Sequence, residues 1–380
     1  MGVLGVRSRR FLPTVVVSVV LVAACGTSDA EEALAEGILS APLEATSTVL
    51  ADGFVIPQGV AVIGEDEYLI STRASGLHHY ADGETAVVDG TPAVEVFSTG
   101  GVIVGGMMDV SLHPDFEDNG LVYLAYLDED LTFAVSRFDF SDRSLADAEV
   151  IFESEFQTLG AAFAWQDADH FFISIGTTDV VHPQDLSVDG GKIHRLRADG
   201  SVPDDNPTFD DADGPSSIWS IGHRNNQGLV FDDGALYATE HGDIGGDEFN
   251  LVERAGNFGF PNVTSGGLNF DNVPSVSQDV LDQAIDPLVT WPDFTIAPTG
   301  VTRLTGSAFA ELDGQFLFGG LQAQNLFAVN IETGETSLLV PDAGRVRDVA
   351  QLPSGDILML SEFPLDAASN GELIRLSPAG

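Results

Sequence analysis

The chain has 380 residues, with 59 acidic side chains against 15 lysines and arginines, and one cysteine. A hydrophobic content of 44% supplies a sizeable core, so the composition excludes a wholly disordered chain. The net charge of −44 argues against nucleic-acid binding and against charge-driven docking on anionic lipid, because both need clustered cations. The single cysteine excludes a disulfide framework and a CxxC metal site.

The first 24 residues have the pattern of a lipoprotein signal peptide. Three arginines at positions 7, 9 and 10 precede an apolar stretch, residues 11–24, which is shorter than the roughly 20 residues of a bilayer span. The stretch ends at Val22-Ala23-Ala24-Cys25, which resembles a bacterial lipobox. We therefore expect Cys25 to carry a lipid and the protein to be extracytoplasmic, anchored to a bacterial envelope membrane. The alternative is an ordinary signal peptide with an incidental cysteine, and the paired arginines also hint at a twin-arginine signal.

Residues 25–45 are predicted to form an acidic tether, followed by a folded domain over residues 46–380. Removal of the signal peptide takes away three arginines and no acid, which leaves 12 cations against 59 acids and a net charge of −47. Such a surface keeps the protein soluble by self-repulsion, which salt screens.

A pair of β-rich runs recurs along the rest of the chain. Each run alternates apolar and polar residues, which is typical of half-buried strands. The six pairs lie at 67–80, 121–140, 170–200, 235–256, 315–334 and 356–380. Dipeptides that favour tight turns, such as Asp233-Gly234 and Asp313-Gly314, stand directly before some of them.

Six units of about 50–55 residues, with no long helical period between them, predict an all-β, six-bladed β-propeller. Each blade would be a four-stranded meander, and the ring would hide most sheet edges. A two-domain β-sandwich is the alternative, but the repeat count favours the propeller. Long insertions near 177–191, 201–217 and 258–290 are expected to build a binding face.

A series of motifs follows in order across residues 50–380. The densest are Gly222-His223-Arg224-Asn225-Asn226-Gln227-Gly228, Thr239-Glu240-His241-Gly242-Asp243 and Gly245-Gly246-Asp247-Glu248. Others are Leu112-His113-Pro114-Asp115, Gly191-Lys192-Ile193, Asp199-Gly200-Ser201, Ile296-Ala297-Pro298 and Gly344-Arg345-Val346-Arg347-Asp348. Together they resemble the glucose/sorbosone dehydrogenase family, soluble quinoproteins that use pyrroloquinoline quinone (PQQ). The family fold is a six-bladed propeller, in agreement with the repeat count.

The resemblance implies a site for PQQ, an ortho-quinone that bears three carboxylates. Arg345 and Arg347, two residues apart on a strand, project to one face and match residues that bind the cofactor carboxylates. Arg224 and Asn225 match positions beside the quinone carbonyls, and Thr295 matches a further contact to the cofactor. The alternative for Arg345 and Arg347 is a solvated strand face that pairs with surplus acids.

The resemblance also implies a calcium ion. Gly242 and Asp243 match the two main-chain carbonyls that ligate the catalytic calcium, and calcium prefers oxygen ligands. Asp247 and Glu248 are a weaker candidate for a second calcium site, or they hold a turn. His223 is expected to be a supporting residue rather than a reactive one, and so is His241.

Three family positions that handle substrate or cofactor are changed. The histidine that acts as general base falls on Thr158, which cannot take up a proton near neutral pH. A position that contacts sugar falls on Val104, and a lysine that contacts PQQ falls on Gln322. His182, in a loop further along the chain, is a weak substitute for the missing base.

The sequence therefore predicts a PQQ- and calcium-dependent sugar (aldose) dehydrogenase-like lipoprotein. It would pass hydride from a sugar or alcohol carbon to the quinone, with an unidentified electron acceptor, and the missing base raises the hypothesis of a degenerate site. A non-catalytic propeller that binds a sugar, a quinone or a surface partner is the alternative, and a lactonase-type propeller is a third. No nucleic-acid partner is expected, and membrane contact is expected only through the N-terminal lipid.

Overall fold

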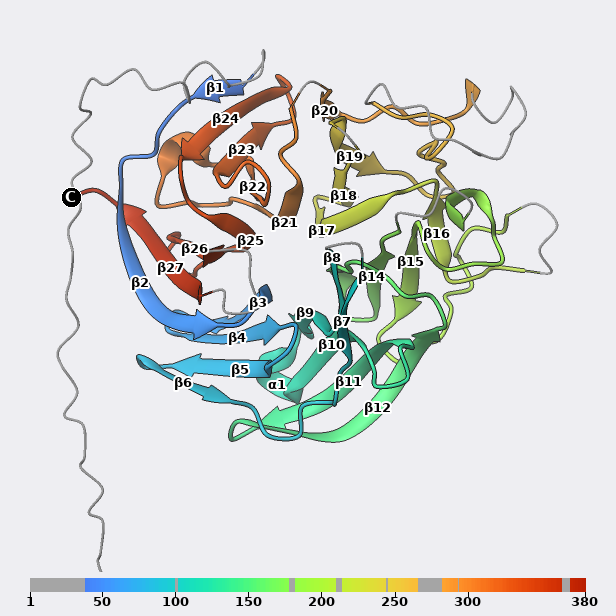
Figure 1. Cartoon of the computed structure of the whole chain (residues 1–380), viewed down its shortest axis with the longest axis horizontal. Coiled ribbons are helices and arrows are strands. Elements are labelled where there is room, and N and C mark those ends of the chain that lie inside the picture. The colour runs from blue at the N-terminus through green and yellow to red at the C-terminus, as the bar shows by residue number, and fades with distance from the viewer. Residues whose placement is uncertain are drawn as a thin grey trace, which may run out of the picture.

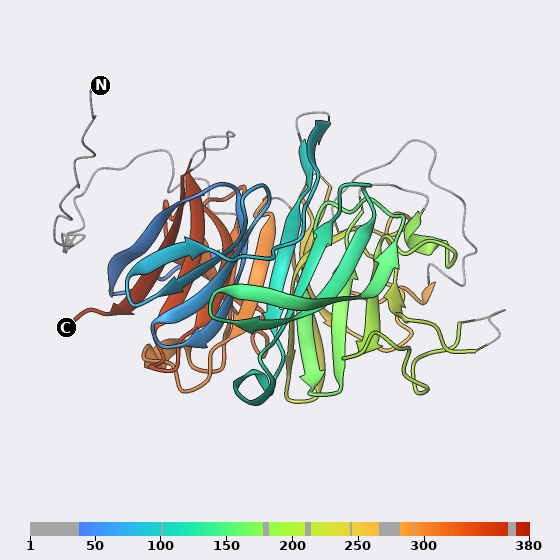
Figure 2. The same cartoon turned by 90° about the horizontal axis from the view of Figure 1, so that it is seen from below.

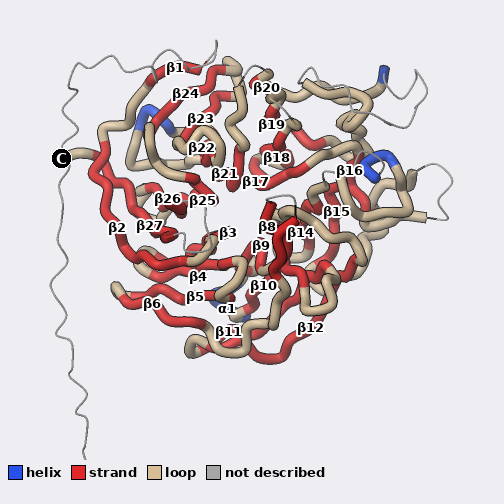
Figure 3. The backbone as a smooth tube through the Cα atoms, in the orientation of Figure 1, coloured by secondary structure: helices blue, strands red, loops and turns tan. Residues whose placement is uncertain are grey.

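The computed structural model describes residues 38–99, 102–177, 182–209, 214–243, 245–265, 282–292, 294–363 and 370–380. Six sheets are arranged as blades around a central axis (Figure 1), and strands make up nearly all of the regular structure (Figure 3). The predicted all-β, six-bladed propeller is confirmed. Among the helices of the described segments, none is both long and apolar enough to cross a membrane.

Each blade is an antiparallel meander whose first strand lies nearest the axis. Counted from the axis outward, the first blade consists of β3 (Pro57–Gly64), β4 (Glu67–Thr72), β5 (Gly76–Ala81) and β6 (Glu84–Val87), and the second of β9 (Met107–Leu112), β10 (Leu121–Leu127), β11 (Phe133–Ser141) and β12 (Ser144–Ser154). The third consists of β13 (Phe163–Asp167), β14 (His170–Ile175), β15 (Lys192–Arg197) and β16 (Ile218–Ile221), and the fourth of β17 (Asn225–Asp232), β18 (Ala235–His241), β19 (Asp247–Val252) and β20 (Val289–Trp291). The fifth consists of β21 (Pro298–Arg303), β22 (Phe316–Gly320), β23 (Leu326–Asn330) and β24 (Glu335–Val340), and the sixth of β25 (Arg345–Gln351), β26 (Ile357–Phe363), β27 (Asn370–Pro378) and β2 (Ala45–Phe54).

The six predicted pairs of β-rich runs are the second and third strands of the six blades. The turn between β17 and β18 shows why its sequence is informative. Asp233 and Gly234 have φ angles of 47° and 80°, and a two-residue hairpin loop needs this left-handed backbone. The short helical elements are α1 (Phe116–Asn119), η2 (His182–Gln184) and η3 (Ala310–Leu312).

The ring is closed by strands from the two ends of the described chain. The N-terminal β2 pairs with β27, and so completes the blade formed by the C-terminal strands. Before it, β1 (Ile38–Ser40) pairs in parallel with β24 on the outer edge of the neighbouring blade, and the Leu43 N–H donates to the Leu339 carbonyl at 2.8 Å. The structure therefore places residues 38–45 on the propeller rather than in a free tether. Cys25, the signal peptide and the rest of the tether lie outside the described residues.

Six clusters of buried apolar side chains fill the spaces between the blades, and each cluster is shared by two neighbours. Leu69 of β4, for example, packs in the same cluster as Val122 of β10. Because the core forms a ring around the axis, the axis itself is free to carry polar groups. A hairpin of β7 (Val96–Thr99) and β8 (Val102–Gly105) projects beyond one face of the disc (Figure 2).

Candidate functional site

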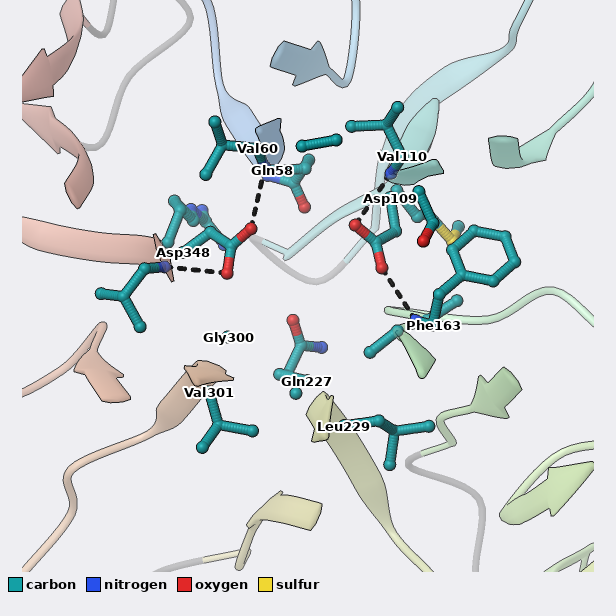
Figure 4. Close-up of a pocket in the computed structure, with 18 of the residues that line it drawn as sticks. Gln58, Val60, Asp109, Val110, Phe163, Gln227, Leu229, Gly300, Val301 and Asp348 are labelled. Atoms are coloured by element: carbon teal, nitrogen blue, oxygen red, sulfur yellow. Dashed lines mark hydrogen bonds between the residues drawn. The ribbon is translucent and has the colours of Figure 1, made fainter. Parts of the chain in front are cut away.

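A cavity of about 280 Å³ lies on the axis, lined by residues of the first strands of all six blades or residues adjoining them. Asp109 of β9 and Asp348 of β25 point toward one another across it, and Gln227 of β17 also points inward (Figure 4). Gln227 and Asp348 belong to the family motifs but were assigned no role, and Asp109 belongs to none of them. Nothing in their local pattern indicates that the three residues face a common axis.

Each of the two aspartates joins neighbouring blades. Asp109 accepts hydrogen bonds from the N–H groups of Val110 at 2.8 Å and Phe163 at 2.9 Å. Asp348 accepts in the same way from Val349 and from Val60 of the adjacent blade, both at 2.8 Å.

Small neighbouring residues leave room for these carboxylates. A Cβ atom on Gly300 would lie 1.8 Å from Asp348 Oδ1, and one on Gly59 would lie 2.3 Å from Asp109 Oδ1. The two carboxylates are therefore built into the ring.

Burial makes the aspartates weak acids. It raises the pKa of Asp109 to about 8, the charge of Asp348 adds to the effect, and the two N–H donors oppose it. Burial also raises the pKa of Asp348 to about 7, against its own N–H donors. The two groups therefore hold protons well above the range in which an ordinary carboxyl releases them.

Arg345 and Arg347 lie at the start of β25 and share one acid. Arg345 Nε and Arg347 Nη2 each donate to Glu362 Oε1 at 2.8 Å. The side chains of Arg345 and Arg347 are only 15% and 11% exposed, so they do not form a solvated strand face. Arg347 also lines the axial cavity, and its buried Nε has no partner among the described residues.

Arg224 lies just before β17 and near the other two predicted arginines. Its guanidinium donates to Asp243 Oδ1 at 2.9 Å and to the His241 carbonyl at 3.2 Å. Burial lowers the pKa of His241 to about 3, with Arg224, Arg347 and Arg345 lowering it further through their charges. Arg224 and the pair Arg345 and Arg347, which are more than 100 positions apart in the sequence, therefore lie close enough to one imidazole to lower its pKa.

Arg73 is a fourth arginine in this region, and sequence reasoning missed it. It is 4% exposed and donates to the carbonyls of Gly105 at 2.6 Å and Leu159 at 2.7 Å. Burial lowers its pKa to about 9, and the charge of Arg347 adds to that. No sequence signal could have identified Arg73, because its sequence context is an ordinary strand-to-turn segment.

The remaining predicted cofactor contacts lie around the same end of the axis. Asn225 begins β17, accepts a hydrogen bond from Gln227 Nε2 at 3.0 Å, and places its Nδ2 3.4 Å from His241 Nδ1. His241 Nε2 donates to the Pro298 carbonyl at 2.9 Å, so its Nδ1 is the unprotonated nitrogen. Thr295 is partly buried in the loop before β21.

A buried carboxylate fixes the segment that carries Arg224. Glu240 is 4% exposed and accepts hydrogen bonds from His223 Nδ1 at 2.9 Å, from Asn226 Nδ2 at 2.9 Å and from the Arg224 N–H. His223 is fully buried and its other nitrogen contacts Ser220 Oγ at 2.8 Å. The expected supporting role of His223 therefore agrees with its surroundings.

The predicted calcium ligands lie in a tight turn after β18. The Gly242 N–H donates to Asp247 Oδ1 at 2.8 Å, while the Asp243 carboxylate is taken by Arg224. Among the described residues, no group of three or more His, Cys, Asp and Glu side chains is placed to hold a metal ion. Any calcium here would rely on main-chain carbonyl oxygens.

The weaker pair, Asp247 and Glu248, does not converge on one point. Successive residues of a strand face opposite sides of the sheet. Asp247 Oδ2 accepts the N–H groups of Ile296 at 2.7 Å and Ala297 at 2.8 Å, whereas Glu248 accepts from Ser265 Oγ at 2.7 Å. This arrangement favours the alternative role for Asp247, which is to hold a turn.

Two of the three changed family positions, Thr158 and Val104, are buried in the fold. Thr158 is fully buried, and its Oγ1 lies 2.7 Å from the Gly160 carbonyl and 2.8 Å from that of Gly176. Val104 is part of the apolar core, and Gln322 is exposed. His182 belongs to η2, but its side chain is outside what the structure describes.

The fold and this site define a six-bladed propeller with a cluster of partly buried arginines at one end of its axis. The model of the Glucose / Sorbosone dehydrogenase family matches residues 54–375, and the chain belongs to that family. It is 31% identical over 364 residues to the uncharacterized protein slr1608 of Synechocystis sp., covering 88% of this chain and 86% of that one.

Two further relatives have names that describe an activity. The aldose sugar dehydrogenase YliI of Escherichia coli is 28% identical over 368 residues, covering 91% of this chain and 96% of that one. The apo crystal structure of the E. coli soluble aldose sugar dehydrogenase superposes with a TM-score of 0.74 at 26% identity, covering 88% of this chain and all of the other. The quinoprotein glucose dehydrogenase B of Acinetobacter calcoaceticus is 49% identical over 74 residues, which is 19% of this chain and 15% of that protein.

Proposed function

We propose that this protein is a lipid-anchored, extracytoplasmic sugar dehydrogenase-like propeller that binds PQQ at the arginine cluster. The observation that carries the proposal is that three arginines lie at the same end of the axis. Arg224 stands just before β17, and Arg345 and Arg347 stand at the start of β25, where Arg347 lines the axial cavity. The aldose sugar dehydrogenase and quinoprotein relatives support the same cofactor and a small sugar as substrate.

The arginine cluster fits a ligand that carries several carboxylates. Four arginines meet two acids in this region. Glu362 pairs with Arg345 and Arg347, Asp243 pairs with Arg224, and Arg73 donates only to carbonyls. The positive charge therefore exceeds the paired negative charge, and an anionic ligand would balance the excess. Arg347 lines the axial cavity, so a ligand that enters the cavity can reach its guanidinium group.

PQQ, when bound, would accept the hydride from the sugar carbon and be reduced. Arg345 and Arg347 would hold its carboxylates, and Arg224 with Asn225 would lie beside its carbonyls, where positive charge and N–H donors favour the reduced form. Thr295 would add a contact from the loop before β21. Calcium would be held by the carbonyl oxygens of Gly242 and Asp243.

Oxidation of a sugar also requires a base that accepts the proton of the sugar hydroxyl. Thr158 is fully enclosed and already occupied by the carbonyls of Gly160 and Gly176, so it does not serve as a base. Loss of a positioned base lowers the rate about 10²–10⁴-fold. We therefore propose a site that binds PQQ tightly and turns over aldoses slowly or not at all.

A titration of PQQ into the purified chain, with and without calcium, tests the proposal. Tight binding with reduction of a dye by aldoses supports an active dehydrogenase, and tight binding without turnover supports a degenerate one. The absence of PQQ binding would support the alternative, a non-catalytic propeller for a sugar or surface partner.

Substitution of Arg345 tests the assigned carboxylate contact directly. Arg345→Ala is expected to weaken PQQ binding at least tenfold. Arg303→Ala is the matched control, because Arg303 lies on β21 and pairs with Asp232, away from the cluster. Equal PQQ affinity in the two variants would remove the assigned role of Arg345.

The lipid anchor is testable separately. Metabolic labelling with a fatty acid is expected to mark the wild-type chain in a bacterial host and not Cys25→Ala. Equal labelling of the two would contradict lipidation at this position.

A further inference from the structure

Glu362 stands behind the predicted carboxylate-binding arginines and belongs to no motif in the sequence. It lies on β26 directly opposite Arg345 of β25, and its side chain is only 1% exposed. It reaches both arginines because Arg345 and Arg347, two residues apart, project to the same face of β25.

One carboxylate oxygen serves both cations. Arg345 Nε and Arg347 Nη2 each lie 2.8 Å from Glu362 Oε1, while Oε2 is buried with no partner among the described residues. Two adjacent guanidinium groups repel one another, and the charge of Arg347 together with burial lowers the pKa of Arg345. The charge of Glu362 opposes that shift, and it acts in the same sense on Arg73. Glu362 is thus the counter-charge around which the arginines are arranged.

The ion pairs leave other donors of the same arginines available. Among the described residues, Arg345 Nη2 and Arg347 Nη1 make no hydrogen bond, whereas Arg345 Nη1 donates to the Leu321 carbonyl at 3.1 Å. A planar guanidinium that is fixed at one nitrogen can present its other edge in a defined direction. A carboxylate ligand would then bind two guanidinium groups whose orientation is already fixed. Binding would therefore cost less side-chain entropy than binding to two mobile arginines.

We propose that Glu362 is a positioning residue for the anion site, which holds Arg345 and Arg347 in the orientation that a carboxylate ligand needs. The inference rests on the proposed function insofar as PQQ is that ligand. Its role is geometric: a side chain that keeps an acceptor at Oε1 is sufficient, even though it lacks the charge.

Because Oε2 has no partner among the described residues, a substitution can change Oε2 and keep the acceptor at Oε1. In Glu362→Gln the amide oxygen can keep the position of Oε1, and the amide nitrogen can occupy the position of Oε2, where it displaces no bond that the structure records. Glu362→Ala removes the acceptor and the charge together. Both variants add one positive charge to the cluster, so attraction by net charge alone would tighten ligand binding equally in both.

The experiment is a titration of wild type, Glu362→Gln and Glu362→Ala with PQQ, followed by absorbance, and with citrate, followed by calorimetry. Glu362→Gln is expected to bind at least as tightly as wild type, and Glu362→Ala at least tenfold more weakly. Circular dichroism shows whether each variant is folded at the temperature of the titration. Glu372→Gln, on β27 of the same blade, is the control for charge, since Glu372 makes no ion pair within the described segments.

The outcomes separate the two proposals. Equal affinities of Glu362→Gln and Glu362→Ala would overturn the positioning role, whatever the ligand. If wild type binds citrate but not PQQ, the proposed function fails, and the comparison with citrate still decides the role of Glu362. If wild type binds neither, both proposals are wrong.

Discussion

Substitution of Asp348 gives a quantitative test of the burial of its carboxyl group in the axial cavity. The Asp348→Asn substitution removes this titratable group from the cavity. It also costs one of the two hydrogen bonds from Val60 and Val349, since the amide nitrogen cannot accept an N–H. That loss is about 1 kcal/mol and does not depend on pH.

The expected dependence on pH follows from the raised pKa. Burial moves the pKa of Asp348 from its ordinary 3.8 to about 7, so the folded protein binds this proton more tightly than the unfolded chain. The resulting stabilisation is complete below the unfolded pKa and is lost as the pH rises through the folded pKa. Between pH 5 and pH 8 the loss amounts to about 2–3 kcal/mol. This figure is an upper bound, because the cavity beside Asp348 admits water.

Urea unfolding at pH 5 and pH 8 measures this effect. The stability of wild type relative to Asp348→Asn is expected to fall by about 2–3 kcal/mol between the two pH values. Asp118→Asn, at an exposed position in α1, provides the control for a general charge effect. The same change of stability with pH in wild type and Asp348→Asn would refute the reasoning.

Three further predictions concern stability. Thr158→Val should cost about 1–3 kcal/mol in unfolding free energy, because it removes the hydroxyl that contacts the Gly176 carbonyl and accepts the Gly160 N–H. Thr158→Ser should cost less, and equal losses would argue against the hydroxyl contacts. Gly59→Ala should lower the free energy of unfolding by about 1–3 kcal/mol, because the added Cβ would overpack against Asp109. In an Asp109→Ala background the same substitution should cost less, which a double-mutant cycle measures. Strictly additive losses of stability would contradict the contact. The midpoint of thermal unfolding should rise between about 0.05 and 1 M NaCl, because salt screens the repulsion between the surplus acidic side chains and the Debye length falls to about 3 Å. An unchanged midpoint would argue that this repulsion does not limit stability.

The strands in the middle of each blade were the most predictable part of the fold. They alternate apolar and polar residues, and dipeptides such as Asp233-Gly234 mark their turns. The first strands were missed, except for the one that carries Arg345 and Arg347, because positions near the axis hold Gly, Gln and Asp rather than an alternating pattern. Gln227-Gly228 has the composition of a loop, yet both residues line the axial cavity.

The site could be predicted in part. Arg224, Arg345 and Arg347 were identified through family motifs, and the structure brings them together around His241. Glu362 and Arg73 were not found, because their roles depend on the pairing of β25 with β26 and on contacts between blades. The sequence carries no direct record of either. The same limit applies to Thr158, whose hydroxyl bonds two carbonyls that only the folded chain brings near it.

The pairing of β2 with β27 has a consequence for how the molecule is made. A chain that lacks its last strand is an open arc, with the partner of β2 missing and one set of blade-to-blade contacts unmade. The closed ring therefore forms only after β27 has been synthesised. Earlier folding intermediates expose unpaired strand edges, which favour association with other chains.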